Sequence, residues 1–350
     1  MTLLVGRAAK RLEGPPPNLQ VMNSFHLLNR RTLATLVFLL CGCFLPLAAA
    51  AQPPPEPFSA LMVLPEDGKE PFIREIDAAT RSIDLYLYLL SDEQIIRALQ
   101  RAQLRGVNVQ VMLEPEPYGG AQIELETWQR LDTAGIDVRW SPGRFRFAHV
   151  KMMIVDERVL LVMNLNMTQS AFDENREFAM LTTDQVLINE ATALFHADWH
   201  DDPDFRPTIL ITSPDNSRSA IGNLLESATV SIDIYAEALT DAAIIDTLLA
   251  AHERGVHIRL IVPELTGTSP EHEEPGFLAR SGVMVGVLTS PYAHAKAIIV
   301  DQRLAFVGSQ NLTGNSLDNN REVGVLLDDP MALLRLIAFF DRDFAVANRI

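Results

Sequence analysis

Cysteine is nearly absent from this chain, and its scarcity limits the chemistry open to the protein. The 350 residues include two cysteines, Cys41 and Cys43, and both lie in an apolar stretch near the N-terminus. The sequence after residue 51 therefore offers no disulfide, no thiolate metal site and no cysteine nucleophile. Catalysis there must depend on other side chains.

Basic side chains are also scarce beyond the N-terminal segment. Five of the 29 lysines and arginines precede residue 52, together with one of the 45 acidic residues. The remainder has 24 basic and 44 acidic side chains, a formal charge of −20. This field repels polyanions at long range, which argues against nonspecific DNA binding but is compatible with a locally basic site.

The apolar N-terminal stretch covers residues 32–51 and directly follows Arg30 and Arg31. Basic residues, an apolar core and small residues before a proline-rich stretch are typical of a secretory signal. The stretch is also long enough to be a membrane anchor. We therefore predict that residues 1–51 are a signal peptide or an N-terminal anchor. In both cases the chain after Gln52 is exported, into the periplasm or out of the cell.

The rest of the chain repeats itself, which predicts two similar halves. Ser82-Ile-Asp-Leu-Tyr returns 149 positions later as Ser231-Ile-Asp-Ile-Tyr. In both copies, apolar periodicity predicts alternating helices and strands with one hairpin. We expect an α/β fold in which each half is a mixed β-sheet flanked by helices. The halves, residues 52–205 and 206–350, are predicted to pack as a pseudo-two-fold pair with one active site between them.

A set of polar residues is repeated in the same register. The pattern His-x-Lys-x4-Asp occurs at His149, Lys151 and Asp156, and again at His294, Lys296 and Asp301. Each copy is followed by a polar pair and then by Asn-Arg-Glu. The pairs are Asn164 with Asn166 and Ser309 with Asn311, and the glutamates are Glu177 and Glu322. This duplication predicts that the two halves pool their polar side chains in one site.

Two histidines and two lysines are suited to phosphodiester chemistry. A neutral imidazole can attack phosphorus, and a protonated one can donate to the leaving oxygen. The lysines can stabilise the growing negative charge, and the Asn and Ser side chains add oriented donors. Because the lysines supply positive charge, we expect no metal and no other cofactor. His196 and His200 have the spacing of a zinc pair, but the repeat does not reproduce them.

The two aspartates of the motif are predicted to be structural. On a strand, His149 and Lys151 share a face, but Asp156 lies seven residues from the histidine, roughly 23 Å away along a straight strand. Asp156 and Asp301 are instead expected in hairpin turns. If each turn has two residues, paired positions sum to 315 and 605. That register would place His149 opposite Asn166.

With this doubled signature, the chain resembles the phospholipase D superfamily over essentially all of its length after the N-terminal segment. The second copy has the family's Gly-Ser-x-Asn pattern, at Gly308 to Asn311. The first copy departs from it, with Met163 and Asn164 where Gly-Ser is usual. Asn164 can still donate a hydrogen bond to the substrate.

The resemblance implies roles for the repeated residues. It implies a phosphohistidine intermediate, with His149 as the nucleophile and His294 as the acid. It also implies that Glu177 and Glu322 hold the second ring nitrogen of the histidines and so fix their tautomers.

The two copies also differ just before the first histidine, where the first half has four extra residues. This insertion lies within Gly143–Ala148 and includes Arg144 and Arg146. The two arginines could bind a substrate phosphate or head group. They could equally form the solvent-facing side of a strand.

Together these features predict an exported phosphodiesterase of the phospholipase D type, acting on a phospholipid or a similar small phosphodiester. Export and the acidic charge favour a lipid over a nucleic acid as the substrate. Contact with a membrane surface is compatible with an exported protein and with a lipid substrate. The alternatives are a periplasmic nuclease of the same superfamily, a transphosphatidylase, and a non-catalytic phosphate-binding protein. Because one chain holds both motifs, a monomer is sufficient to form the active site.

Overall fold

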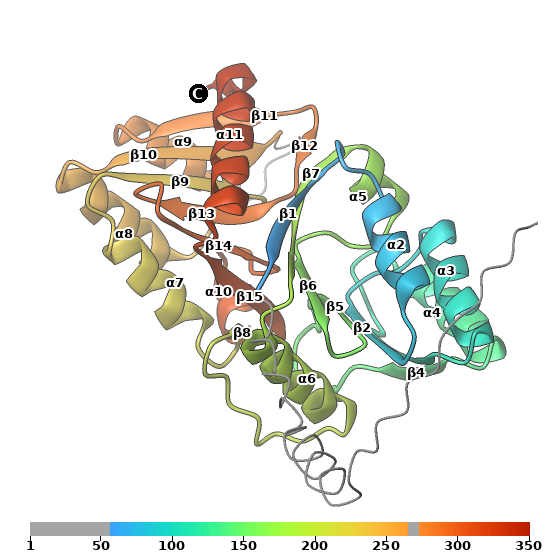
Figure 1. Cartoon of the computed structure of the whole chain (residues 1–350). Helices are drawn as coiled ribbons and strands as arrows, with labels where there is room; N and C mark the ends of the chain where they lie inside the picture. Colours follow the sequence, from blue (N-terminus) through green and yellow to red (C-terminus); the bar gives the residue numbers. More distant parts are fainter. Residues whose placement is uncertain (1–56, 265–272) are drawn as a thin grey trace, which may run out of the picture. The chain divides into compact units, whose positions relative to one another are not determined.

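The computed structural model describes residues 57–264 and 273–350. The predicted signal or anchor segment lies outside these residues. In the described part of the chain, none of the helices combines the length and apolarity that crossing a membrane requires. The described part has an α/β architecture built on two sheets (Figure 1).

The first half is built on a mixed sheet with the strand order β1-β7-β6-β5-β2-β3-β4. Its strands are β1 (Ser59–Leu64), β2 (Ser82–Leu87), β3 (Asn108–Leu113), β4 (Asp137–Trp140), β5 (Lys151–Val155), β6 (Val159–Met163) and β7 (Asn175–Thr182). Its helices are α2 (Glu70–Ala78), α3 (Glu93–Leu104), α4 (Ala121–Thr133), α5 (Gln169–Asp173) and α6 (Gln185–Trp199).

The second half repeats this plan, with the strand order β16-β11-β10-β9-β13-β14-β15-β8. Its strands are β8 (Ile211–Ser213), β9 (Ser231–Ala236), β10 (His257–Pro263), β11 (Met284–Leu288), β12 (Tyr292–Ala293), β13 (Lys296–Val300), β14 (Leu304–Gly308), β15 (Glu322–Leu327) and β16 (Asn348–Arg349). Its helices are α7 (Ser217–Glu226), α8 (Ala242–Glu253), α9 (Glu273–Arg280), α10 (Gly314–Asp318) and α11 (Pro330–Val346).

The two sheets correspond strand for strand, apart from β12 and β16. In each sheet three strands run parallel and the motif-bearing hairpin joins them antiparallel, as in β2 against β5 and β9 against β13. The predicted fold class, with two similar halves on mixed sheets, is confirmed. The prediction succeeded because strand periodicity and the internal repeat supported the same assignment.

Three apolar cores hold the layers together. One lies between the first sheet and α2 and α3, and a second lies between the second sheet and α7 and α8, on the outer sides of the molecule (Figure 1). The third core combines the inner faces of both sheets with α6 and α11. In it, Phe178 of β7 and Tyr235 of β9 meet edge to face, with ring centroids 5.2 Å apart. The halves therefore share a continuous core, at whose edge the polar site lies.

Two buried arginines reinforce this shared core with reciprocal ion pairs. Arg176 of the first half bonds Asp343 of α11 with an Nε–Oδ2 distance of 2.6 Å. Arg321 of the second half bonds Asp198 of α6 at 2.8 Å. Both are the arginines of the repeated Asn-Arg-Glu, and their side chains are almost completely buried. The first half is thus ion-paired to α11 of the second half, and the second half to α6 of the first.

The predicted hairpin register is wrong by one residue. Val155 pairs with Val159, and the second hairpin is built alike, so that paired positions sum to 314 and 604. The turn has three residues because Asp156 adopts a left-handed conformation, with φ of 55°. His149 lies before the ladder begins and is not opposite Asn166. A turn's length depends on its backbone conformation, which the sequence pattern alone did not fix.

The segments that carry the histidines pair with the opposite half. Ala148 forms a parallel bridge with Arg321, and β12, just before His294, pairs in parallel with the start of β7. The His149 N–H donates to the Arg321 carbonyl at 2.8 Å. The start of each glutamate-bearing strand therefore lies beside the histidine of the other half.

Candidate active site

Each histidine is held by the glutamate of the opposite half. His149 Nδ1 lies 2.8 Å from Glu322 Oε2, and His294 Nδ1 lies 2.6 Å from Glu177 Oε1. Both carboxylates are fully buried. The parallel pairing described above produces this crossing, because it places the first residues of β7 and β15 against the other half's histidine. The geometry agrees with the tautomer-fixing contact that the family resemblance implied, and it adds that the contact joins the halves.

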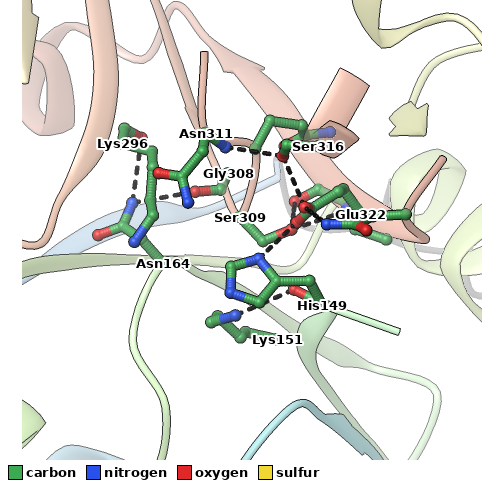
Figure 2. A network of polar contacts seen from close by, with 12 residues as sticks. His149, Lys151, Asn164, Lys296, Gly308, Ser309, Asn311, Ser316 and Glu322 are labelled. Carbon is green, nitrogen blue, oxygen red and sulfur yellow. Dashed lines mark hydrogen bonds and ion pairs between the residues drawn. The ribbon is translucent and has the colours of Figure 1, made fainter. Parts of the chain in front are cut away.

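The carboxylate behind His149 has a denser set of partners than the one behind His294. Ser316 Oγ donates to Glu322 Oε1 at 2.6 Å (Figure 2). Asn320 Nδ2 donates to the same oxygen at 3.0 Å. Glu177 has a long contact from Asn175, at 3.5 Å, and its Oε2 has no hydrogen-bond partner among the described residues.

The two motif lysines are almost completely buried beside their histidines. Lys151 Nζ donates to the His149 carbonyl at 3.0 Å and lies 5.1 Å from the centre of the Tyr88 ring. Lys296 Nζ donates to the His294 carbonyl at 2.6 Å. Burial lowers the pKa of Lys151 to about 7, with Lys296 adding to the effect and Glu322 opposing it. The charges of the two halves therefore act on one another across a single site.

Glu237, which the sequence analysis did not identify, completes the second half of the site. Its Oε1 lies 3.1 Å from His294 Nε2, and its Oε2 lies 2.5 Å from Lys296 Nζ. Glu237 directly follows β9, on the strand face that Tyr235 presents to the shared core. The repeat does contain a signal for it, because Glu237 is the position 149 residues after Tyr88 in an otherwise similar segment.

The equivalent position in the first half is aromatic. The Tyr88 ring lies edge-on to the His149 ring, with centroids 4.7 Å apart, and Phe147 packs edge-on against the same tyrosine at 6.1 Å. No carboxylate among the described residues pairs with His149 Nε2 or with Lys151. One half thus offers a histidine with a free ring nitrogen, whereas both nitrogens of the other histidine face carboxylates.

This difference gives the two histidines opposite protonation. Burial lowers the pKa of His149, and Glu322 only partly opposes that effect. Burial also disfavours charge on His294, but Glu177 and Glu237 outweigh it and raise its pKa to about 9. At neutral pH the site therefore holds one neutral imidazole and one imidazolium, the combination that phosphodiester cleavage by two histidines requires.

Two predicted site residues, Asn164 and Ser309, are buried among the strands that carry the motifs. Asn164 is fully buried, donates to the carbonyls of Lys296 and Gly308, and accepts from the Phe178 N–H at 2.6 Å. Ser309 is also fully buried, and its hydroxyl accepts from the Val323 N–H at 3.0 Å. Both side chains join strands inside the protein. Ser309 also hydrogen-bonds Glu322, the carboxylate behind His149. The catalytic role of Ser309 and the substrate contact of Asn164 stay predictions.

Asn166 and Asn311 lie two residues further along the chain and are partly exposed. The Oδ1 atom of each is buried without a hydrogen-bond partner among the described residues. An amide with unused bonding capacity beside the histidine segments fits the predicted role as a substrate-orienting group, which stays a prediction.

Asp156 and Asp301 lie in the hairpin turns, away from the histidines. The Asp156 carboxylate accepts from the N–H groups of Thr80, Arg81 and Ser82 and from the Thr80 hydroxyl. Asp301 has the same set of bonds with residues 229–231. Burial would raise the pKa of each carboxyl, but these bonds lower it to about 2. The arrangement fits the structural role predicted for both residues.

The two arginines of the insertion have different surroundings. Arg144 forms ion pairs with Asp198 and Asp201, so its charge is used within the protein. Arg146 is exposed and stacks on Phe147, with its guanidinium carbon 4.8 Å from the ring centre. It forms no ion pair within the described ranges. The substrate contact stays a prediction for both arginines, and Arg144 would have to leave its ion pairs to make it.

Among residues 57–264 and 273–350, no group of three or more His, Cys, Asp or Glu side chains is placed to hold a metal ion. His196 and His200 lie at the end of α6, where His200 Nδ1 is 2.8 Å from the His196 carbonyl.

Comparison with known families agrees with this site. Residues 72–199 and 221–344 each match the family described as cardiolipin synthase, phospholipase D-like domain. These segments make up more than half of the chain, so the chain belongs to this family within the phospholipase D superfamily. The protein is accordingly an enzyme of the phosphodiesterase type.

The chain is also similar in sequence to individual proteins of known name. It is 36% identical to the human mitochondrial cardiolipin hydrolase over 140 residues, which are 39% of this chain and 51% of that protein. It is 23% identical to the major cardiolipin synthase ClsA of Bacillus subtilis, over 81% of this chain and 68% of that one. The chain thus spans about half of the human protein's length.

Among solved structures, phosphatidylserine synthase of Haemophilus influenzae shares the fold. The TM-score is 0.66 at 14% identity, and the match covers 83% of this chain and 87% of that one.

Proposed function

We propose that the protein is an exported phospholipase D-type hydrolase that cleaves a phospholipid or a similar phosphodiester without a metal ion. The observation that carries the proposal is the unequal pair of histidines, which are joined across the halves through Glu322 and Glu177. At neutral pH the first is neutral, with no carboxylate of the described residues at its Nε2, and the second is charged.

In the first step of the proposed mechanism, His149 Nε2 attacks phosphorus and the P–O bond to the leaving group breaks. His294 gives its Nε2 proton to the departing oxygen, and a phosphohistidine remains on His149. Glu322 accepts the Nδ1–H of His149 and stabilises the positive ring that forms. Lys151 and Lys296 stabilise the charge on the non-bridging oxygens.

In the second step, His294 takes a proton from water, and the resulting hydroxide attacks phosphorus. The P–N bond breaks, which restores neutral His149 and protonated His294. An alcohol in place of water would give transfer to a new head group.

A lipid substrate is supported by the names of the relatives, which are a cardiolipin hydrolase and a cardiolipin synthase. The formal charge of −20 after residue 51 also disfavours nucleic acid. A membrane surface is then the place of action, and the predicted signal or anchor would bring the protein to it.

The test is a substrate panel assayed in EDTA. Purified protein is incubated with labelled phosphatidylcholine, cardiolipin and single-stranded DNA, with and without glycerol as acceptor. His149→Ala and His294→Ala variants are assayed in parallel, and His196→Ala, an exposed histidine on α6, is the matched control. We expect lipid hydrolysis in wild type and control, and a loss of at least about 10³-fold in the two site variants.

Each other outcome identifies an alternative. Cleavage of DNA alone would make the protein a nuclease, and transfer to glycerol without hydrolysis would make it a transphosphatidylase. No turnover of any substrate would favour a phosphate-binding protein. Activity abolished by EDTA would overturn the metal-independent mechanism.

A further inference from the structure

We propose that Glu237 is a displaceable occupant of the substrate-phosphate position, which a phosphodiester must move aside to reach His294 and Lys296. The inference rests on the proposed function, because it assumes that these two side chains bind the substrate's phosphate. It adds a residue that the repeated motif does not contain, and it predicts how the site discriminates among phosphate compounds.

The contacts of Glu237 are those that a bound phosphate would make. One carboxylate oxygen lies 3.1 Å from His294 Nε2, the nitrogen that must donate to the leaving oxygen. The other lies 2.5 Å from Lys296 Nζ, which must reach a non-bridging oxygen. A carboxylate and a phosphate both present anionic oxygens to such donors. A substrate phosphate and the Glu237 carboxylate therefore cannot hold both donors at once.

The exposure of Glu237 is compatible with displacement. Its side chain is 25% exposed, whereas the two glutamates behind the histidines are fully buried. It also stands on the opposite side of the His294 ring from Glu177, so that its departure leaves the ring oriented. Glu177 and Glu322 hold the histidines in place, and Glu237 covers the reactive nitrogen of one of them.

A carboxylate occupies the proposed phosphate position only in the second half of the site, among the described residues. At the equivalent position Tyr88 packs beside His149 and brings no anionic group. The nucleophile is therefore open while the acid and its lysine are covered. A phosphodiester, with a single negative charge, has to compete with one carboxylate. A phosphomonoester or inorganic phosphate at neutral pH carries up to two charges and would be repelled more strongly by the displaced carboxylate.

Removing the carboxylate charge should therefore tighten phosphate binding. The experiment measures the binding of inorganic phosphate by calorimetry at pH 7 to the full chain and to Glu237→Gln and Glu237→Ala variants. Glu253→Gln, an exposed glutamate of α8 in the same half, is the control for the change in net charge. We expect both Glu237 variants to bind phosphate at least about tenfold more tightly than wild type and the control.

A second measurement separates this role from a structural one. Glu177, Glu237 and Lys296 are the charged groups that act on His294. Without the Glu237 charge the alkaline limb of the pH–rate profile should move to lower pH, because the histidine loses one of the two anions that keep it protonated. Melting temperatures show which variants are folded, and Glu237→Ala serves if the Gln variant is not.

Phosphate binding that is unchanged or weaker in folded Glu237 variants would overturn the proposal. The binding arm needs no turnover, so its result stands even if the substrate panel shows no hydrolysis. In that case the proposed function fails, while the competition between Glu237 and phosphate is decided independently.

Discussion

At the scale of single residues, the two histidines have the same sequence context and different chemistry. Both belong to the same repeated motif, and the Nδ1 atom of each contacts a buried glutamate from the opposite half. What differs is the residue that faces the reactive nitrogen, which is an aromatic ring for His149 and a carboxylate for His294. In the proposed mechanism, the difference between nucleophile and acid therefore depends on Tyr88 and Glu237 and not on the motif itself.

The pH dependence of the reaction follows from this assignment. His149 must be neutral, so the acid limb of kcat/KM reports its pKa, which lies below the ordinary 6.5. His294 must be protonated, so the rate falls as pH rises through its pKa of about 9. Lys151 must also be protonated to stabilise the non-bridging oxygens, and its pKa of about 7 adds a partial fall of the rate above neutral pH. We therefore expect a maximum near neutral pH and a steeper fall as pH passes about 9. A rate that does not fall between pH 8 and pH 10 would contradict the protonation states described here.

The crossed glutamates give a second prediction. Glu322→Gln removes an anion that raises the pKa of His149, so the acid limb should move to lower pH while the alkaline limb stays. Glu177→Gln should move the alkaline limb to lower pH, because it acts on His294. Each change should also cost about 10- to 100-fold in rate. If Glu322→Gln moved the alkaline limb and Glu177→Gln the acid limb, each glutamate would act on the histidine of its own half.

At the scale of elements, the repeated motif uses its aspartates to fix hairpins to neighbouring strands. Each carboxylate collects backbone N–H groups from the start of β2 or β9. The turn preference of aspartate predicted both residues in hairpin turns, but a turn length of two residues gave the wrong register. The left-handed backbone of Asp156 and Asp301 is supported by contacts with distant residues, which a local pattern does not show.

Replacing one of these aspartates should destabilise the fold and leave the chemistry intact. We expect Asp156→Asn to lower the free energy of unfolding by about 1–3 kcal/mol, because an amide cannot accept all of these bonds. The carboxyl's pKa is about 2 in the folded protein, below its ordinary 3.8, so the stabilisation is present at neutral pH. It is lost as pH falls through that range. Urea unfolding measures the change, with the exposed Asp132→Asn as control.

Breaking one of the buried ion pairs of Arg176 or Arg321 should lower the free energy of unfolding by more. Arg176→Met would leave Asp343 buried without its main cationic partner, and we expect a loss of about 3–5 kcal/mol. Arg97→Met, which breaks an exposed i,i+4 pair with Glu93, should cost less than about 1 kcal/mol. Similar unfolding midpoints for the two variants would mean that the buried ion pair does not stabilise the joined halves.

At the scale of the whole molecule, the sequence predicted two similar halves and their α/β fold. It did not predict the strand pairing and the histidine–glutamate contacts between the halves. The repeat and the apolar periodicity were sufficient for the fold class and for both His–Lys pairs. The crossing of the glutamates depends on strand segments exchanged between halves, such as Ala148 against Arg321. Glu237 occupies a position at which the two halves differ, since its counterpart is Tyr88, so the repeated residues did not predict it. Long-range pairing of this kind is decided by the shared core, not by local sequence.

Two unequal histidines in one site should form a covalent intermediate on only one of them, and trapping that intermediate is the most direct test. Wild type and His294→Ala are mixed with a labelled phosphodiester, quenched in alkali to preserve phosphohistidine, and mapped by mass spectrometry. We expect the label on His149, at a higher level in His294→Ala if hydrolysis of the intermediate slows more than its formation, and no label in His149→Ala. A label on His294 in wild type, or turnover without any labelled histidine, would contradict the account.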